Sequence, residues 1–390
     1  MPLLAPNAPP EPHTLTSVTS KLPIEALGGI VEIDLEGLPE DDAAAVHEAW
    51  CDALADLGMV ERAQRERGGI PPVVRPADAE RTAMLSALSQ RVTLAALEQR
   101  RGDLWMLHAA GLAGDDGRVV VLVGPSGRGK TTAVRTLATS FGYVSDESVA
   151  IDDEGRVWPY RKPLSVIEKQ GAQKAERSPS ELGLRALPDA ALRVAAVVLL
   201  DRVPESAGLP TIETLDVGDA LEDLVSQSSG LTSMPAPLRS IAALAGATGG
   251  IRRVTYHEAA SLRSVVESLL AGSDAAADAV PEGRGAGEGD VSRLAVRTSA
   301  GGYSRTAFVD ALDLWNPDRV AVLRSGRDGT GVLHVLAGVA PALWRAADAA
   351  SAADLTAAAV AAYGPPGGDA DALVEAAADA LVETGLLSRT

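Results

Sequence analysis

One stretch of the chain, residues 119–132, has the residue types and spacing of a phosphate-binding loop. Five apolar residues are followed by G-P-S-G-R-G-K-T and then by apolar residues at helical spacing. The glycines let the backbone turn tightly, so that N–H groups and the amino end of the next helix can meet phosphate oxygens. In this motif the lysine reaches the β/γ-phosphates and the threonine after it holds Mg²⁺. The sequence therefore predicts that ATP and Mg²⁺ bind at Gly124, Ser126, Gly127, Arg128, Gly129, Lys130, Thr131 and Thr132.

Two acids that end apolar strands after the loop are candidates to complete the site, because phosphoryl transfer needs a carboxylate that holds Mg²⁺ or accepts a proton. Asp146, followed by Glu147, comes one helix after the loop, and its strand could lie beside the strand of the loop. Asp201 ends a second, continuously apolar strand. Simpler roles stay open, since Asp146 could cap a turn and Asp201 could form an ion pair at the strand end.

The composition limits the classes of partner. The chain has 390 residues, 46% of them hydrophobic, which is enough for two or three cores. Its 35 basic and 53 acidic residues give a net charge of −18, which argues against general binding to nucleic acid or to an anionic membrane. No apolar run approaches the roughly 18 residues of a membrane span, no secretory signal pattern opens the chain, and the single cysteine fits a reducing compartment. We therefore expect a soluble, cytoplasmic protein.

The hydrophobic pattern predicts an α/β fold built from several parts. A proline-rich lead at 1–20 precedes a strand and helices within 21–103. The region 104–271 is predicted to be the phosphate-loop core, with a helix after the loop. Its further strands are expected at 104–113, 142–147, 194–201 and 252–256, a hairpin at 148–160, and further helices at 217–227, 237–246 and 258–271.

The last part of the chain follows a Gly-, Ala- and acid-rich stretch at 272–291, which has no hydrophobic period and is predicted to be a linker. Within 292–390, strands at 319–324 and 331–336 form a hairpin, and three helices begin near 339, 352 and 369. A hairpin with three short helices indicates a winged-helix domain. Because such a linker implies few contacts across it, we expect 292–390 to fold without the rest of the chain.

The region from 104 to 271 resembles the C-terminal domain of HPr kinase/phosphorylase, a phosphate-loop family related in fold to PEP carboxykinase. The resemblance lies in the run His108-Ala109-Ala110, the loop itself, and the run Tyr143 to Glu147. It implies catalytic roles for His108, Asp146 and Glu147, with Asp146 as the base toward a substrate hydroxyl and with Thr131 and Asp146 at the metal. The acidic pair of that family is usually Asp-Asp, whereas this chain has Asp-Glu.

The last hundred residues resemble the PqqD-like domain, the recognition element (RRE) for precursor peptides in pathways that modify ribosomally made peptides (RiPPs). The resemblance lies in the hairpin, in Ala340 to Trp344, and in Ala380 to Leu387. It implies that the leader of a precursor peptide adds as a strand and inserts apolar side chains between strand and helix. The residues expected to contact this peptide are Val322, Val335, Leu373 and Leu381. A DNA-binding winged helix is disfavoured, because 352–362 contain no Lys or Arg.

Two hypotheses follow from these resemblances. In the first, which we favour slightly because the acidic pair is altered, the protein binds ATP, grips the leader peptide and presents the core peptide to partner modifying enzymes in RiPP or antibiotic biosynthesis. In the second, it is an ATP-dependent kinase that phosphorylates a Ser or Thr of the precursor peptide.

Overall fold

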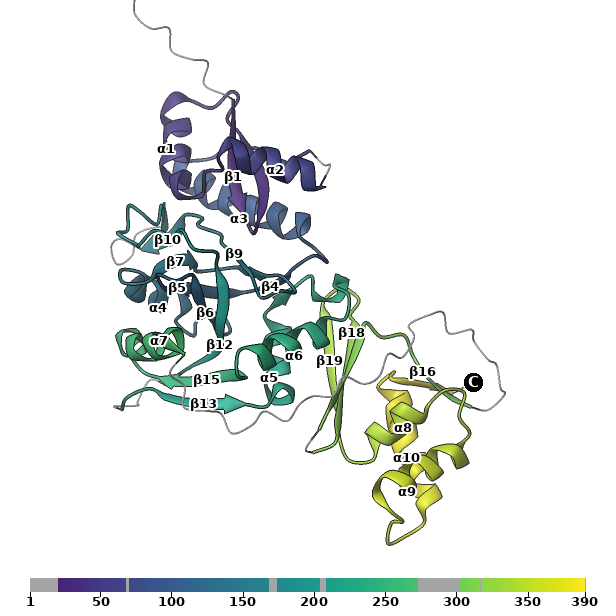
Figure 1. The fold of residues 1–390 in the computed structure, drawn as a ribbon. Coiled ribbons are helices and arrows are strands. Elements are labelled where there is room, and N and C mark those ends of the chain that lie inside the picture. The colour runs from purple at the N-terminus through teal and green to yellow at the C-terminus, as the bar shows by residue number, and fades with distance from the viewer. Residues whose placement is uncertain are drawn as a thin grey trace, which may run out of the picture.

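The structure, a computed structural model, describes residues 20–67, 70–167, 174–203, 208–272, 302–315 and 317–389. Nearly all of the predicted lead (1–20) and of the predicted linker (272–291) lies outside these residues. The chain has the mixed α/β character expected from the sequence, and its three parts follow one another along the molecule in Figure 1. Among the described helices, none combines the length and the apolar character needed to cross a bilayer.

The amino-terminal part is a small sheet covered by helices. Strands β1 and β2 form an antiparallel hairpin, and β3 pairs in parallel with β2. Trp50, Ile33 and Leu88 lie fully buried in the core between this sheet and the helices. The elements are β1 (Lys21–Ala26), β2 (Gly29–Asp34), α1 (Glu40–Trp50), α2 (Leu57–Arg67), β3 (Val73–Val74) and α3 (Arg81–Gln99).

The middle part is organised around a six-stranded sheet of order β13-β15-β12-β6-β5-β7. Its strands are β5 (Ala109–Ala113), β6 (Arg118–Val123), β7 (Gly142–Ser145), β12 (Arg193–Arg202), β13 (Thr211–Leu215) and β15 (Ile251–Tyr256). Alternate side chains of β6 and β12 pack to opposite faces, where α4 (Lys130–Leu137) and α7 (Leu262–Ala271) cover one face and α5 (Val217–Ser226) and α6 (Pro237–Ala247) the other. This burial on both faces explains why the central strands are continuously apolar.

Strand direction brings the candidate residues to one edge of this sheet. Strands β6, β12 and β15 are parallel, and β5 is antiparallel to both β6 and β7, so β6 and β7 run the same way. The phosphate loop and Asp146 therefore follow the same ends of their strands. The expectation that these two strands lie side by side is wrong, because β5 lies between them.

A second sheet splits the strand expected at 104–113. Strand β4 (Trp105–Leu107) belongs to a sheet of order β14-β4-β8-β9, whereas β5 belongs to the six-stranded sheet. The break falls at His108, whose backbone N–H donates to the carbonyl of Gln227 at 2.7 Å. The remaining strands of the middle part are β8 (Val149–Ile151), β9 (Val157–Trp158), β10 (Leu164–Ile167), β11 (Lys174–Arg177) and β14 (Ser228–Ser229).

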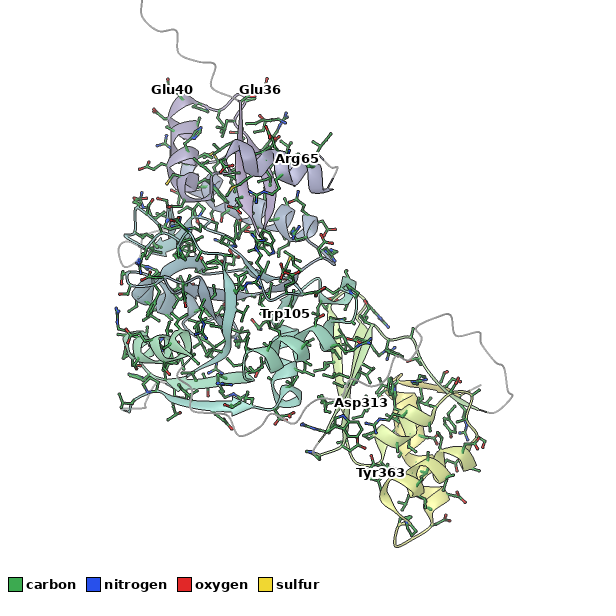
Figure 2. The ribbon with its side chains drawn as sticks, in the orientation of Figure 1. Glu36, Glu40, Arg65, Trp105, Asp313 and Tyr363 are labelled. Atoms are coloured by element: carbon green, nitrogen blue, oxygen red, sulfur yellow. The ribbon has the colours of Figure 1, made fainter. Side chains whose placement is uncertain are left out.

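The carboxy-terminal part is a three-stranded sheet followed by helices. Asp313 and Tyr363, labelled in Figure 2, lie in this part, where Arg345 binds both Asp313 and Asp318 at 2.7 Å and so ties a helix to the sheet. The elements are β16 (Tyr303–Arg305), β17 (Asp310–Leu314), β18 (Arg319–Ser325), β19 (Gly331–Leu336), α8 (Ala340–Ala346), α9 (Ala352–Tyr363), α10 (Ala370–Glu383) and β20 (Leu387–Arg389).

The central strand of the sheet β17-β18-β19 is buried on both faces and joins the last two parts. Val320 and Val322 of β18 pack with the helices α8 to α10, whereas Ala321 and Leu323 pack into the core of the middle part. The expectation that few contacts connect 292–390 to the rest of the chain is therefore wrong. An isolated carboxy-terminal part would expose the apolar face that includes Leu314 and Leu323.

Asp310 of β17 fastens this sheet to α6. Its side chain is 1% exposed and accepts from the N–H of Leu238 at 2.9 Å and from that of Arg239 at 3.3 Å. The Arg239 guanidinium adds an ion pair at 3.0 Å. Because Ala236, at the N-cap of α6, provides no capping side chain, an aspartate distant in sequence caps this helix.

We predict that Asp310→Ala destabilises the full chain by about 2 kcal/mol, because it removes a helix cap and a buried charge-assisted hydrogen bond. Asp310→Asn keeps an acceptor oxygen and should therefore destabilise the chain clearly less than Asp310→Ala. Urea unfolding of the wild type and both variants measures the difference. An Asp310→Ala variant as stable as the wild type would contradict this account of the interface.

Candidate functional site

The phosphate loop has the backbone geometry that its glycines suggest. It connects β6 to α4, with Gly127 at φ +85° and Gly129 at φ +89°, a conformation that favours glycine. A β-carbon at position 129 would lie 2.8 Å from the hydroxyl oxygen of Tyr256, which donates to the carbonyl of Arg128 at 2.8 Å. Tyr256, at the end of β15, therefore binds the loop through its hydroxyl. The same hydroxyl occupies the space that a side chain at Gly129 would need.

Lys130 begins α4 and turns its ammonium back toward the loop. Its Nζ donates to the carbonyl of Gly124 and, at 3.4 Å, to that of Pro125, and the residue is 6% exposed. Burial lowers the pKa of Lys130, while the nearby carboxylate of Asp146 opposes this shift. The partly desolvated Lys130 ammonium thus lies at the loop, where it could bind the terminal phosphates of a nucleotide.

Asp146 follows β7 and is 8% exposed. Its Oδ1 accepts from the Tyr143 hydroxyl at 3.0 Å, and the Thr131 hydroxyl also interacts with the carboxylate. Burial raises the pKa of Asp146, and Lys162 and these two hydroxyls counteract the shift. The two residues expected at the metal, Thr131 and Asp146, are therefore brought together even though their elements are separated by a strand.

His108 and Glu147 complete the group expected to be catalytic. Burial and the charge of Lys130 lower the pKa of His108, while Glu147 and Asp146 raise it, with burial the largest influence. A lowered pKa makes this imidazole neutral at pH 7. Glu147 forms an ion pair with Lys162, with its Oε2 2.9 Å from the Lys162 Nζ.

The outer side of the loop is open and cationic. Ser126, Gly127 and Arg128 line a shallow hollow together with Arg202, and Thr132 is exposed at the start of α4. Arg128 forms an ion pair with Asp201 at 3.2 Å. Asp201 therefore forms an ion pair at the end of its strand, which is one of the two roles that the sequence allowed for it. Its partner, Arg128, belongs to the phosphate loop.

Lys162, which sequence reasoning missed, lies in the middle of the acidic group. It is 5% exposed and follows β9. Burial lowers the pKa of Lys162, but Asp146, Glu147 and Glu176 outweigh this effect, so that the pKa is raised. The sequence signal was weak, since a basic pair after a hairpin is common on surfaces.

The four residues expected to contact a peptide do not form one groove. Val322 is fully buried and Leu381 is 6% exposed, and both belong to the core beneath α8 to α10. Val335 is 41% exposed but pairs with Ala321, on the face of the sheet that points to the middle part. Leu373 is 56% exposed on α10. The prediction of a groove lined by Val322 and Leu381 is therefore corrected, because both fill the core.

Mg²⁺ would be held here mainly through a nucleotide. Within the described residues, no group of three or more His, Cys, Asp or Glu side chains could hold a metal by itself. Mg²⁺ commonly takes one or two protein oxygens together with phosphate oxygens and water. The adjacent Thr131 hydroxyl and Asp146 carboxylate, next to the phosphate loop, fit that pattern.

Comparison with known proteins shows similarity to solved structures. One of these is the Hpr(Ser) kinase/phosphatase from Coxiella burnetii, with 13% identity and a TM-score of 0.24, over 43% of this chain and 95% of that chain. No family model and no curated protein matches the chain. A similarity at this identity and TM-score does not decide an activity.

We predict that Asp146→Asn stabilises the protein at neutral pH, because the wild type must keep a carboxylate ionised in a buried position. The folded-state pKa of Asp146 is raised above its usual 3.8, so its favourable contribution is present below 3.8 and is lost as pH rises through the folded value. The gain in thermal midpoint should thus be larger at pH 7 than in acid. A variant less stable than the wild type at pH 7 would contradict this.

Proposed function

We propose that the chain binds a magnesium–nucleoside triphosphate at the phosphate loop and transfers the terminal phosphoryl group to a hydroxyl group. The observation that carries this proposal is the position of Asp146, a buried carboxylate with a raised pKa beside Thr131 and within the field of Lys130. ATP is the nucleotide we expect, on the resemblance of the loop and the acidic pair to HPr kinases.

Each residue of the site has a definite task in this proposal. Lys130 and the N–H groups of the loop hold the phosphates, and Thr131 orients the metal, which when bound neutralises charge on the phosphates. Asp146 accepts the proton of the attacking hydroxyl, for which a raised pKa is an advantage. His108, neutral at pH 7, lies beside the acidic pair and can hydrogen-bond the acceptor.

A second candidate function is recognition of a precursor-peptide leader by the carboxy-terminal part, with the nucleotide acting as a switch and the core peptide presented to modifying enzymes. Support comes from β19, which is the last strand of its sheet and carries Val332 and Val335, each 41% exposed. A peptide can add to such an edge through its backbone. Strands β18 and β19 are followed by helices α8 to α10, and a winged-helix arrangement of these elements is part of this proposal. The same peptide is our candidate for the hydroxyl acceptor.

We predict that Lys130→Ala weakens binding of Mg²⁺–ATP about ten- to hundredfold, because a charge-assisted contact is lost. Asp146→Asn should bind within severalfold of the wild type yet abolish phosphoryl transfer to a peptide encoded beside the gene. Calorimetry and mass spectrometry measure the two effects. Lys21→Ala, which alters an exposed lysine of β1, is the matched control and should change neither.

Two outcomes would contradict the proposal at different points. A wild-type protein without affinity for ATP or ADP in Mg²⁺ would remove the nucleotide site. Binding with no phosphate on the peptide, in the wild type as in Asp146→Asn, would leave the recognition function and remove the kinase function.

For peptide recognition, we predict that Val335→Asp in the full chain weakens binding of that peptide at least tenfold, because a charge at the strand edge must be desolvated. Ile212→Asp is the matched control, since Ile212 is likewise 41% exposed on an edge strand, β13. Fluorescence anisotropy of a labelled peptide measures both. Equal affinity for the wild type and Val335→Asp would exclude the edge of β19 as the binding surface.

A further inference from the structure

Three consecutive side chains connect the amino-terminal part to the site. The Tyr160 hydroxyl lies 2.9 Å from the Thr93 hydroxyl, Arg161 pairs with Asp52 at 3.2 Å, and Lys162 Nζ donates to the Ser89 hydroxyl at 3.3 Å. The run 160–162 is thus fixed at three successive positions by residues that precede the middle part in the sequence.

Two of these contacts come from one face of α3. Ser89 and Thr93 are one helical turn apart, both are less than 8% exposed, and the Thr93 hydroxyl also donates to the carbonyl of Ser89 at 2.9 Å. Polar side chains on the buried face of a helix need partners. Tyr160 and Lys162 are these partners, so α3 contacts the run 160–162 through specific hydrogen bonds as well as through packing.

On its other side, Lys162 faces the acidic pair. Its Nζ lies 2.9 Å from Glu147 Oε2 and donates to the carbonyl of Pro163 at 3.1 Å. Glu176, which accepts from Ser165, lies within its field, as does Asp146. Three carboxylates would repel one another and a triphosphate if this buried cation were absent.

We propose that Lys162 is a positioning residue of the site: it holds Glu147 in an ion pair and offsets the charge of the acidic group, so that a triphosphate can bind beside Asp146. The amino-terminal part, through Ser89, holds Lys162 in place. This inference rests on the proposed nucleotide site and adds to it a role for a residue outside the loop and the acidic pair. It also gives α3 a role at the site.

The test compares ATP binding with and without Mg²⁺ by calorimetry on the full chain. Lys162→Gln leaves the carboxylates uncompensated, so affinity for metal-free ATP should fall by about tenfold, and affinity for Mg²⁺–ATP should fall clearly less. Lys162→Arg keeps the charge and should bind metal-free ATP within about threefold of the wild type. Lys21→Gln, which breaks an exposed Lys–Glu pair of 2.7 Å in the amino-terminal part, is the matched control.

A merely structural lysine would behave differently. If Lys162→Gln bound both forms of ATP as the wild type does, or lost both to the same extent, the proposal would be overturned. A wild type that binds neither form would instead refute the nucleotide site itself, so the two failures are distinguishable.

A second pair of variants covers the case in which Lys162→Gln does not fold. Glu147→Gln keeps the Lys162 charge and removes one carboxylate beside it, so it should bind metal-free ATP more tightly than Lys162→Gln/Glu147→Gln, in which both charges are gone. Equal affinities of these two variants would overturn the proposal.

Discussion

The burial of the Asp146 carboxylate is the constraint on which the site depends. A carboxylate with 8% exposure is tolerated only when nearby groups compensate it, and here the Tyr143 and Thr131 hydroxyls and the Lys162 ammonium do so. Each compensating group comes from a different place: β7, the start of α4, and the run after β9. Holding one acid in place therefore fixes the relative positions of the phosphate loop, the strand edge and, through Lys162, the helix α3.

The sheet of the carboxy-terminal part extends this arrangement. Alternate side chains of its strand β18 pack into two different cores. Asp310 caps α6, which lies on the face of the main sheet opposite α4. Arg319 adds ion pairs to Asp216 and Asp219 at the start of α5, at 2.9 and 2.7 Å. This sheet therefore contacts the two helices, α5 and α6, that cover one face of the strands of the phosphate loop.

Local sequence spacing was enough to predict the glycine-rich turn before α4, most helices and the strand before Asp146, because these depend on neighbours a few residues apart. It could not show that β5 separates β6 from β7, that Lys162 meets Glu147, or that Asp310 caps α6, since these pairings join distant segments. Val322 and Leu381 show the same limit. An apolar residue on a strand or helix can line a groove or fill a core, and only the packing of α8 to α10 decides between them.

The most direct test of the central claim is a crystal structure of the protein with Mg²⁺ and a non-hydrolysable ATP analogue. We predict phosphates on the N–H groups of 127–132, Mg²⁺ about 2.1 Å from the Thr131 hydroxyl oxygen, and the Asp146 carboxylate beside the metal or the terminal phosphate. A nucleotide bound elsewhere, or one whose phosphates lie away from Asp146, would contradict it.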